Sequence, residues 1–275
     1  MNELNFTVEK AEDGLLLREF LYMKGLSKTL VKKAKLGGLF VLGESVTVRR
    51  ILSEGETVRV LLPDVRSEGI PPIAIPLKIV YEDDYLILVD KPSNMPTHPS
   101  KGNSLPTLAN AIMARYGEDF TFRAVNRLDR DTSGLVLIAK DAFCANTLAS
   151  SMKKGEFIKK YLARVLGRPT PSSGIIDLPI KRESEASLKR IVADDGKPAK
   201  TEYKVIKEEG NCSLLEIRLF TGRTHQIRVH MAHIGTPLLG DFLYGREDSG
   251  AYFLRCHSLS FPHPITKEIL TFKID

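Results

Sequence analysis

Residues 127–139 have the sequence RLDRDTSGLVLIA, and this stretch decides the fold of the larger part of the chain. Its apolar run GLVLIA is typical of a buried strand, so the charged residues before it form a turn that enters the core. In that turn Asp129 lies between Arg127 and Arg130. Since guanidiniums beside a carboxylate favour its ionised form, we expect Asp129 to be anionic and suited to act as a nucleophile or base. A salt bridge that only pins the turn is the alternative interpretation.

The composition favours an anionic partner. The 275 residues include 40 Lys and Arg against 34 Asp and Glu, which gives a net charge of +6. Three widely spaced cysteines without a CxxC pair predict neither a disulfide framework nor a zinc site, and they fit a reducing compartment. The amino terminus lacks a secretory apolar segment, and no apolar run approaches the length of a membrane span. We therefore expect a soluble, cytoplasmic protein with no membrane partner.

A proline-rich, charged stretch divides the chain. Residues 63–76 have the sequence PDVRSEGIPPIAIP. Repeated prolines exclude a helix interior or a central strand, so this segment is predicted to be a linker. We expect a small N-terminal module at residues 1–62 and a larger domain at residues 77–275.

The N-terminal module is predicted to contain two helices followed by short strands. The first helix covers residues 14–23, and the second follows Ser27 as its cap and runs to about Leu36. Three lysines fall on one face of the second helix: Lys28, Lys32 and Lys35. The strands are expected at residues 39–42, 47–49 and 58–62. An ordinary solvated surface is the alternative interpretation of the lysine face.

Strand-like segments dominate the second part of the chain. They are residues 79–81, 85–89, 122–125, 134–139, 157–166, 202–206, 213–220 and 252–256. Helices are expected at residues 107–116, at 142–154 between an Asp141 cap and Gly155, and at 224–234 before Gly235. Many strands with few helices, not in strict alternation, predict the α+β class with a mixed, largely antiparallel sheet.

Two further clusters carry residues that could take part in chemistry. In LVDKPSNMPTHP, residues 88–99, a strand ends at Lys91 and leads into a proline-rich loop; a rigid turn with a solvated lysine is the alternative. In KKYLARVLG, residues 159–167, strand alternation places Tyr161 on the face opposite Arg164. Tyr161 could stack its ring on a base, although packing alone would also explain a tyrosine in a half-buried strand.

The last cluster is TGRTHQIRVHMAHIGTPLLGDFLYG, residues 221–245. A helix that opens at residues 222–224 would attract anions, and Arg223 is placed to hold a carboxylate or phosphate. Three histidines suggest a metal, but their spacing matches no zinc motif and no acidic residue lies among them, so no metal is expected. The chain also lacks the glycine-rich loops that bind nucleotides, and no cofactor is predicted.

Together these clusters resemble the RluA family of RNA pseudouridine synthases. NRLDRDTSGLVLIAK (residues 126–140) resembles that family's signature around its catalytic aspartate, and the other three clusters match further motifs in the same order. The resemblance spans roughly residues 75–275. It implies a cofactor-free isomerase that acts on RNA, and we expect this protein to be a monomer. Residues 14–62 also resemble, more weakly, the RNA-binding module of the ribosomal-protein S-four type.

The resemblance implies roles for individual residues. Asp129 would be the catalytic aspartate, and Tyr161 would stack against the target uracil and take part in proton transfer. Arg223 would pair with Asp129 and position it, while Arg127 would take the place of the extruded nucleotide. The basic residues expected to contact RNA are Arg127, Arg130, Lys91, His225, Arg228, Lys28, Lys32 and Lys35.

Two positions depart from the family pattern. Many relatives have His where this chain has Asn126, which can form hydrogen bonds but cannot titrate near neutral pH. The N-terminal module has Leu-Gly-Glu at residues 42–44 where such modules often carry Asn-Gly-Lys, which replaces a basic residue by an acidic one.

The favoured function is pseudouridine formation in structured RNA, with ribosomal RNA of the large subunit preferred to transfer RNA. A mainly non-catalytic RNA-binding or ribosome-assembly factor is one alternative. A hydrolase that uses Asp129 with His225 or His230 is another, but neither paired carboxylates nor a triad supports it.

Overall fold

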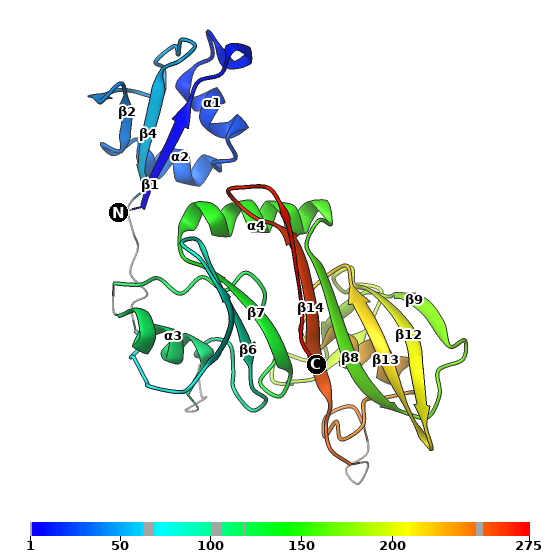
Figure 1. The fold of residues 1–275 in the computed structure, drawn as a ribbon. Helices are drawn as coiled ribbons and strands as arrows, with labels where there is room; N and C mark the ends of the chain where they lie inside the picture. Colours follow the sequence, from blue (N-terminus) through cyan, green and yellow to red (C-terminus); the bar gives the residue numbers. More distant parts are fainter. Residues whose placement is uncertain (1, 63–68, 101–105, 118, 246–249) are drawn as a thin grey trace.

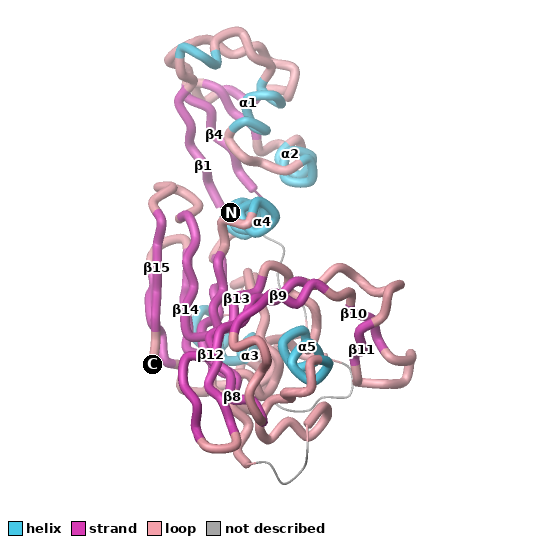
Figure 2. Tube along the Cα trace, turned by 90° about the vertical axis from the view of Figure 1, so that its right-hand side faces the viewer, coloured by secondary structure: helices cyan, strands magenta, loops and turns pink. Residues whose placement is uncertain are grey.

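The computed structural model describes residues 2–62, 69–100, 106–117, 119–245 and 250–275. It shows a small N-terminal body above a larger one, with helix α4 (Ala142–Lys154) between them in both views (Figures 1 and 2). Among the described residues, no helix is long and apolar enough to cross a membrane. Of the expected linker, residues 63–68 lie outside the described residues, and residues 69–76 contain neither helix nor strand.

The N-terminal body is a four-stranded antiparallel sheet, ordered β1-β4-β2-β3, with two short helices. Its elements are β1 (Asn2–Thr7), the 3₁₀ helix η1 (Lys10–Glu12), α1 (Leu17–Met23), α2 (Lys28–Ala34), β2 (Leu39–Val41), β3 (Glu44–Ser45) and β4 (Thr57–Leu62). Each helix buries residues at helical spacing, such as Leu30, Val31 and Ala34 of α2. The hydroxyl of Ser27 accepts a hydrogen bond from the Leu30 amide at 3.3 Å, which confirms the predicted cap.

Two expectations for this body are wrong. The strand expected at residues 47–49 is absent, and β3 lies earlier because Leu42 (φ 52°) and Gly43 (φ 86°) form a tight turn directly after β2. Strand β1 was not expected, and it pairs along its whole length with β4. Its signal is the alternation of Leu4, Phe6 and Val8, which is the period of a half-buried strand.

The larger body is built on a nine-stranded sheet, with the order β5-β6-β7-β14-β8-β13-β12-β9 and β15 paired to β14. The strands are β5 (Lys78–Glu82), β6 (Leu86–Lys91), β7 (Ser133–Ala139), β8 (Ile158–Leu166), β9 (Ser173–Asp177), β12 (Lys200–Glu209), β13 (Cys212–Leu219), β14 (Leu254–Pro262) and β15 (Ile269–Lys273). Only β7 and β14 pair in parallel in the described part of this sheet, which confirms a mixed, largely antiparallel α+β fold.

Three helices and a hairpin complete this body. They are α3 (Leu108–Tyr116), α4, α5 (Gln226–His233) and the hairpin β10 (Ile180–Arg182)–β11 (Arg190–Val192). Seen edge-on, α5 and the hairpin lie on the same side of the sheet (Figure 2). The bounds, cap and terminator predicted for α4 are confirmed, since the Asp141 carboxylate accepts from the Cys144 amide and Gly155 has φ 77°. Strands β9, β10, β11 and β15 were not expected.

The pairing of β7 with β14 explains the glycine at position 134. A Cβ at Gly134 (φ 109°) would overlap the backbone of Cys256, because the parallel pairing brings β14 directly alongside. After it, β7 is buried at every position, as expected for a central strand covered on both faces. The strand expected at residues 122–125 is reduced to a single bridge, between Ala124 and Ile138.

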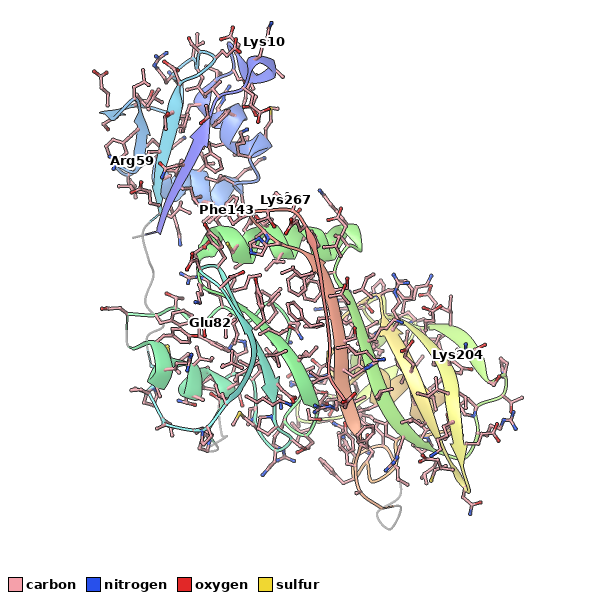
Figure 3. All side chains as sticks on the ribbon, viewed as in Figure 1. Lys10, Arg59, Glu82, Phe143, Lys204 and Lys267 are labelled. Carbon is pink, nitrogen blue, oxygen red and sulfur yellow. The ribbon has the colours of Figure 1, made fainter. Side chains whose placement is uncertain are left out.

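The two bodies share one apolar cluster. Phe143 and Cys144 of α4 are buried together with the core of the N-terminal body. The rings of Phe6 and Phe143 meet edge to face, with centroids 6.4 Å apart, and the Asn146 side chain donates to the Gly25 carbonyl at 3.1 Å. Figure 3 shows Phe143 on α4 beneath the N-terminal body. The N-terminal body is therefore docked on the larger one by burial of apolar surface.

Candidate active site

Asp129 lies on the wall of a cavity of about 620 Å³. The cavity is lined by the loop that carries Asp129, by the loop around Thr97, by β8 and by the start of α5. Among the lining residues that the structure describes, Asp129 is the sole carboxylate. The basic and histidine side chains on the same wall are His98, Arg127, Arg130, Lys159, Arg223, His225 and Arg228. A lone carboxylate among so many cations is suited to chemistry on an anionic ligand.

Lys91 fixes the Asp129 loop by hydrogen bonds from inside the protein. Its ammonium is fully buried and donates to the carbonyls of Pro92, Met95 and Arg130 at 2.8, 2.7 and 3.2 Å. Burial lowers the pKa of Lys91 to about 8. The expectation that Lys91 contacts RNA is wrong, because its hydrogen bonds are used inside the protein. The lysine joins the end of β6 to the aspartate loop and so helps to position it.

Two neutral side chains fix the same loop. The Thr97 hydroxyl donates to the Leu128 carbonyl at 2.8 Å and lies 3.2 Å from the Leu128 amide. The buried Asn126 amide bonds to the backbone of β7 at Leu135 and Leu137, at 3.0 and 2.9 Å. Asn126 thus provides two residues of β7 with the hydrogen bonds that a neighbouring strand would otherwise make. This structural role needs no titrating group.

The two arginines beside Asp129 behave differently. Arg130 forms a bidentate ion pair with the next residue, Asp131, at 2.9 and 3.0 Å. Arg130 is therefore paired with Asp131 and not with Asp129, and its expected contact with RNA stays a prediction. Arg127 is exposed on the cavity wall, where its charge adds to burial in lowering the pKa of His98. Arg127 keeps a position from which it can contact a ligand.

Tyr161 lines the cavity from the middle of β8. It is buried, as are Ala163 and Val165 on the same face, which agrees with the alternation of the strand. Burial raises the pKa of the Tyr161 hydroxyl well above its usual value, and the charge of Asp129 acts in the same direction. The side chain is thus a neutral phenol near Asp129, packed against Cys256 of β14.

Helix α5 begins later than expected. Its first residue is Gln226, whose side-chain oxygen accepts from the Arg223 amide at 2.9 Å and from the Thr221 hydroxyl at 2.7 Å. His225, just before it, has φ 57° and pairs its Nδ1 with the Tyr244 hydroxyl at 2.9 Å. Gln226 therefore fixes the loop that precedes α5 on the cavity wall. The sequence did not indicate this role, although Gln226 lies within residues 221–245.

Arg228, not Arg223, is the arginine embedded in the site. Its guanidinium is buried and forms a bidentate pair with the fully buried Asp241, at 2.7 and 2.6 Å. Although burial opposes it, the bond to Asp241 and the charge of Asp129 raise the pKa of Arg228 above its ordinary value. Asp241 takes the Nε and Nη2 donors of Arg228, but Arg228 lines the cavity, and its expected contact with RNA stays a prediction.

Arg223 lies on the cavity wall but is exposed. Its Nε donates to the Pro198 carbonyl at 2.9 Å, and no ion pair between Arg223 and Asp129 occurs in the described residues. The two side chains share one cavity without direct contact.

The remaining candidates lie outside the cavity. Lys28, Lys32 and Lys35 are exposed at α2, as expected for one face of that helix. Among the histidines of the last cluster, His230 bonds to Thr201 and to the Leu178 carbonyl at 2.8 and 3.0 Å. In the described parts of the chain, no group of His, Cys, Asp and Glu side chains is arranged to hold a metal ion.

Comparisons with known proteins agree with one another. The family model for RNA pseudouridylate synthase matches residues 85–233. The chain is 38% identical over 266 residues to the "uncharacterized RNA pseudouridine synthase YjbO" of Bacillus subtilis (strain 168), covering 94% of each chain. It is 37% identical over 256 residues to the "ribosomal large subunit pseudouridine synthase D" of Xanthomonas campestris, covering 85% of this chain and 76% of that one. The solved structure of "human RNA pseudouridylate synthase domain containing 1" superposes with a TM-score of 0.62 at 25% identity, over 74% of this chain and 85% of that one.

Proposed function

The chain belongs to the RNA pseudouridine synthases of the RluA type, and we propose that it converts specific uridines of large-subunit ribosomal RNA to pseudouridine, with Asp129 as the catalytic residue. The observation that carries this proposal is the position of Asp129 as the sole described carboxylate on the wall of a cationic cavity, which the neutral phenol of Tyr161 also lines. The cavity volume of about 620 Å³ lies within the range of small-ligand sites and suits one extruded nucleotide.

The proposed reaction exchanges one bond for another. The bond between the ribose C1′ and the uracil N1 breaks, the base rotates, and C1′ bonds to C5. A proton leaves C5 and one is gained at N1, so no oxidant or cofactor is consumed. Asp129 could attack the sugar, add to the pyrimidine ring or assist removal of the 2′ hydrogen. The target base must first leave its stack, which costs on the order of a few kcal/mol.

Tyr161 is proposed to contact the uracil ring as a neutral side chain. Because burial raises its pKa, the phenolate is disfavoured at neutral pH, and the hydroxyl is a hydrogen-bond donor in the resting protein. Packing against the base and donation to it therefore fit this group better than acting as a free base. Arg127, exposed on the wall, is proposed to contact the RNA where the base has left.

The choice of RNA rests on names of relatives. Three proteins at 34–39% identity are called ribosomal large subunit pseudouridine synthase D. We extend that target class to this chain, with transfer RNA as the second candidate. A ribosomal RNA target also favours action in the cytoplasm, and we propose that the protein acts as a single chain.

The N-terminal body is proposed to be an S-four-like RNA-binding module. Two short helices and a small antiparallel sheet present the exposed lysines Lys28, Lys32 and Lys35 from one helix. Docking on α4 holds these lysines in a fixed relation to the cavity. The module would therefore add phosphate contacts to those made around the target uridine.

An Asp129→Asn variant tests the proposal. Pseudouridine maps of total RNA are compared between cells that lack the protein and cells that carry the wild-type or the variant protein. We expect at least one uridine of large-subunit ribosomal RNA to be modified only with the wild type. In vitro, the variant should lose at least about 1,000-fold in turnover with RNA affinity changed little. Normal modification by the variant would refute the role of Asp129, and changes confined to transfer RNA would refute the ribosomal target.

A further inference from the structure

A second cavity, of about 380 Å³, adjoins the one that holds Asp129. The two cavities share wall residues at the end of α4, on β8 and β13, and in the loop before α5: Met152, Lys159, Leu219, Gly222 and Arg223. A ligand in the first cavity can therefore continue into the second without leaving the protein surface. The function proposed above assigns no ligand to this second space.

The second cavity carries positive charge that no carboxylate on its described wall neutralises. Lys153, Lys159, Arg218 and Arg223 line it, and the described lining residues include no carboxylate. Lys159 lies on the wall between the two cavities, with its ammonium beside Gly222. No carboxylate forms an ion pair with Lys159 among the described residues, and burial lowers its pKa. A partly buried ammonium without a carboxylate partner favours an anionic ligand.

The same cavity also presents a flat aromatic surface. Phe220 lines the cavity, and its side chain is 44% exposed. The Arg218 guanidinium lies 4.6 Å from the centre of the Phe220 ring. Bases of single-stranded RNA stack on aromatic rings and on guanidinium planes, so this pair is a suitable platform for one base.

We propose that the second cavity binds the nucleotide next to the target uridine on the same RNA strand. Its base would stack on the Phe220–Arg218 pair, and the phosphate that joins it to the target would contact Lys159. Lys153 would contact the next phosphate outward. The inference rests on the proposed function, since it assumes that the first cavity holds a uridine of an RNA strand. It implies that the enzyme opens two neighbouring nucleotides and not one.

The base contact is tested with Phe220→Ala in the full chain. The probe is a fluorescent pentauridylate, and the measurement is its dissociation constant at low salt. Loss of one stacked base should weaken binding by about 5- to 100-fold. The matched control is Ile206→Ala, which removes another exposed apolar side chain (49% exposed) that lines neither cavity. A pentamer of ribose phosphates without bases should bind the wild type and Phe220→Ala equally.

The phosphate contact is tested with two neighbouring lysines at the end of α4. Both are exposed, but Lys153 lines the second cavity and Lys154 lines neither. Lys153→Gln should weaken pentauridylate binding by about 2- to 5-fold at low salt, and Lys154→Gln should change it less. The base-free pentamer should keep the Lys153→Gln effect.

Three results would overturn the inference. They are no saturable binding of pentauridylate by the wild type, Phe220→Ala within twofold of the wild type, or equal effects of Lys153→Gln and Lys154→Gln. Each result is independent of pseudouridine formation, which is measured on ribosomal RNA with the wild-type protein. An enzyme that forms pseudouridine but fails these binding tests would keep the proposed function and lose only this second site.

Discussion

Lysines serve opposite purposes in the two bodies of this protein. Lys91 of the larger body is fully buried, and its ammonium holds three backbone carbonyls beneath the aspartate loop. Lys28, Lys32 and Lys35 of the N-terminal body are exposed at one short helix. The same side chain is thus an internal hydrogen-bond donor in one body and a surface charge in the other.

Burial and local partners therefore decide whether a charged side chain is a structural group or remains available to a ligand. A buried ammonium must satisfy its donors inside the protein, which makes it a structural group. An exposed ammonium keeps its hydration and remains available to a phosphate, at little cost to stability. The cavity around Asp129 is accordingly held together by buried charges such as Lys91 and the Arg228–Asp241 pair, whereas the RNA contacts proposed for the N-terminal body depend on exposed ones.

The largest expected contrast is between Lys91→Met and Lys32→Met. The first change leaves three carbonyls without their donor and should lower the free energy of unfolding by about 3 kcal/mol. The second should stay within about 0.5 kcal/mol of the wild type. Urea denaturation measures both, and turnover at saturating RNA should fall only for Lys91→Met. Equal stability losses would mean that the two lysines do not differ as the structure indicates.

An intermediate effect is expected when all three lysines of α2 are changed to Gln. RNA affinity at low salt should fall by about 10-fold, and the slope of log affinity against log salt should decrease by about 2 to 3. Turnover at saturating RNA should not change. The control is a triple change to Gln at Lys10, Lys204 and Lys273, which removes the same charge from scattered exposed positions; Figure 3 labels the first two. If the control weakens binding equally, only net charge matters and the lysine face is not a site.

A pH dependence that Lys91 alone confers is also expected. Its pKa in the folded protein is lowered to about 8 from an ordinary value of 10.5. Between these two values the unfolded chain binds more protons at this site, so stability from this group rises with pH. The slope is at most about 1.4 kcal/mol per pH unit. The difference in unfolding free energy between the wild type and Lys91→Met should therefore change between pH 8 and 10.5, whereas a difference that stays constant would argue against the lowered pKa.

Much of the local structure could be predicted because its signals are local. The cap at Asp141 and the terminator at Gly155 define α4, and the apolar run after Ser133 defines β7. Strand β1 was not predicted, although the alternation of its apolar residues is visible in the sequence. A full strand was predicted at residues 122–125, where an apolar, aromatic-rich stretch forms a loop that packs on the core and has one bridge. The four motifs did meet at one cavity.

The partners of the charged residues could not be predicted. Asp129 has arginines on both sides in the sequence, yet Arg130 pairs with Asp131. Arg228 and Asp241 are separated along the chain and meet only because the loop after α5 folds back on the helix. Docking of Phe143 against Phe6 likewise joins segments that no local pattern connects.

The amino-acid sequence alone was sufficient for most helices and central strands, for the mixed sheet and for the set of residue types available for chemistry, because helix caps, strand alternation and motif order act over short distances. Only the tertiary structure decided which cations lie inside and which remain in water. Desolvation and hydrogen-bond geometry depend on the surroundings of each group in space, and these are set by segments that come together only on folding.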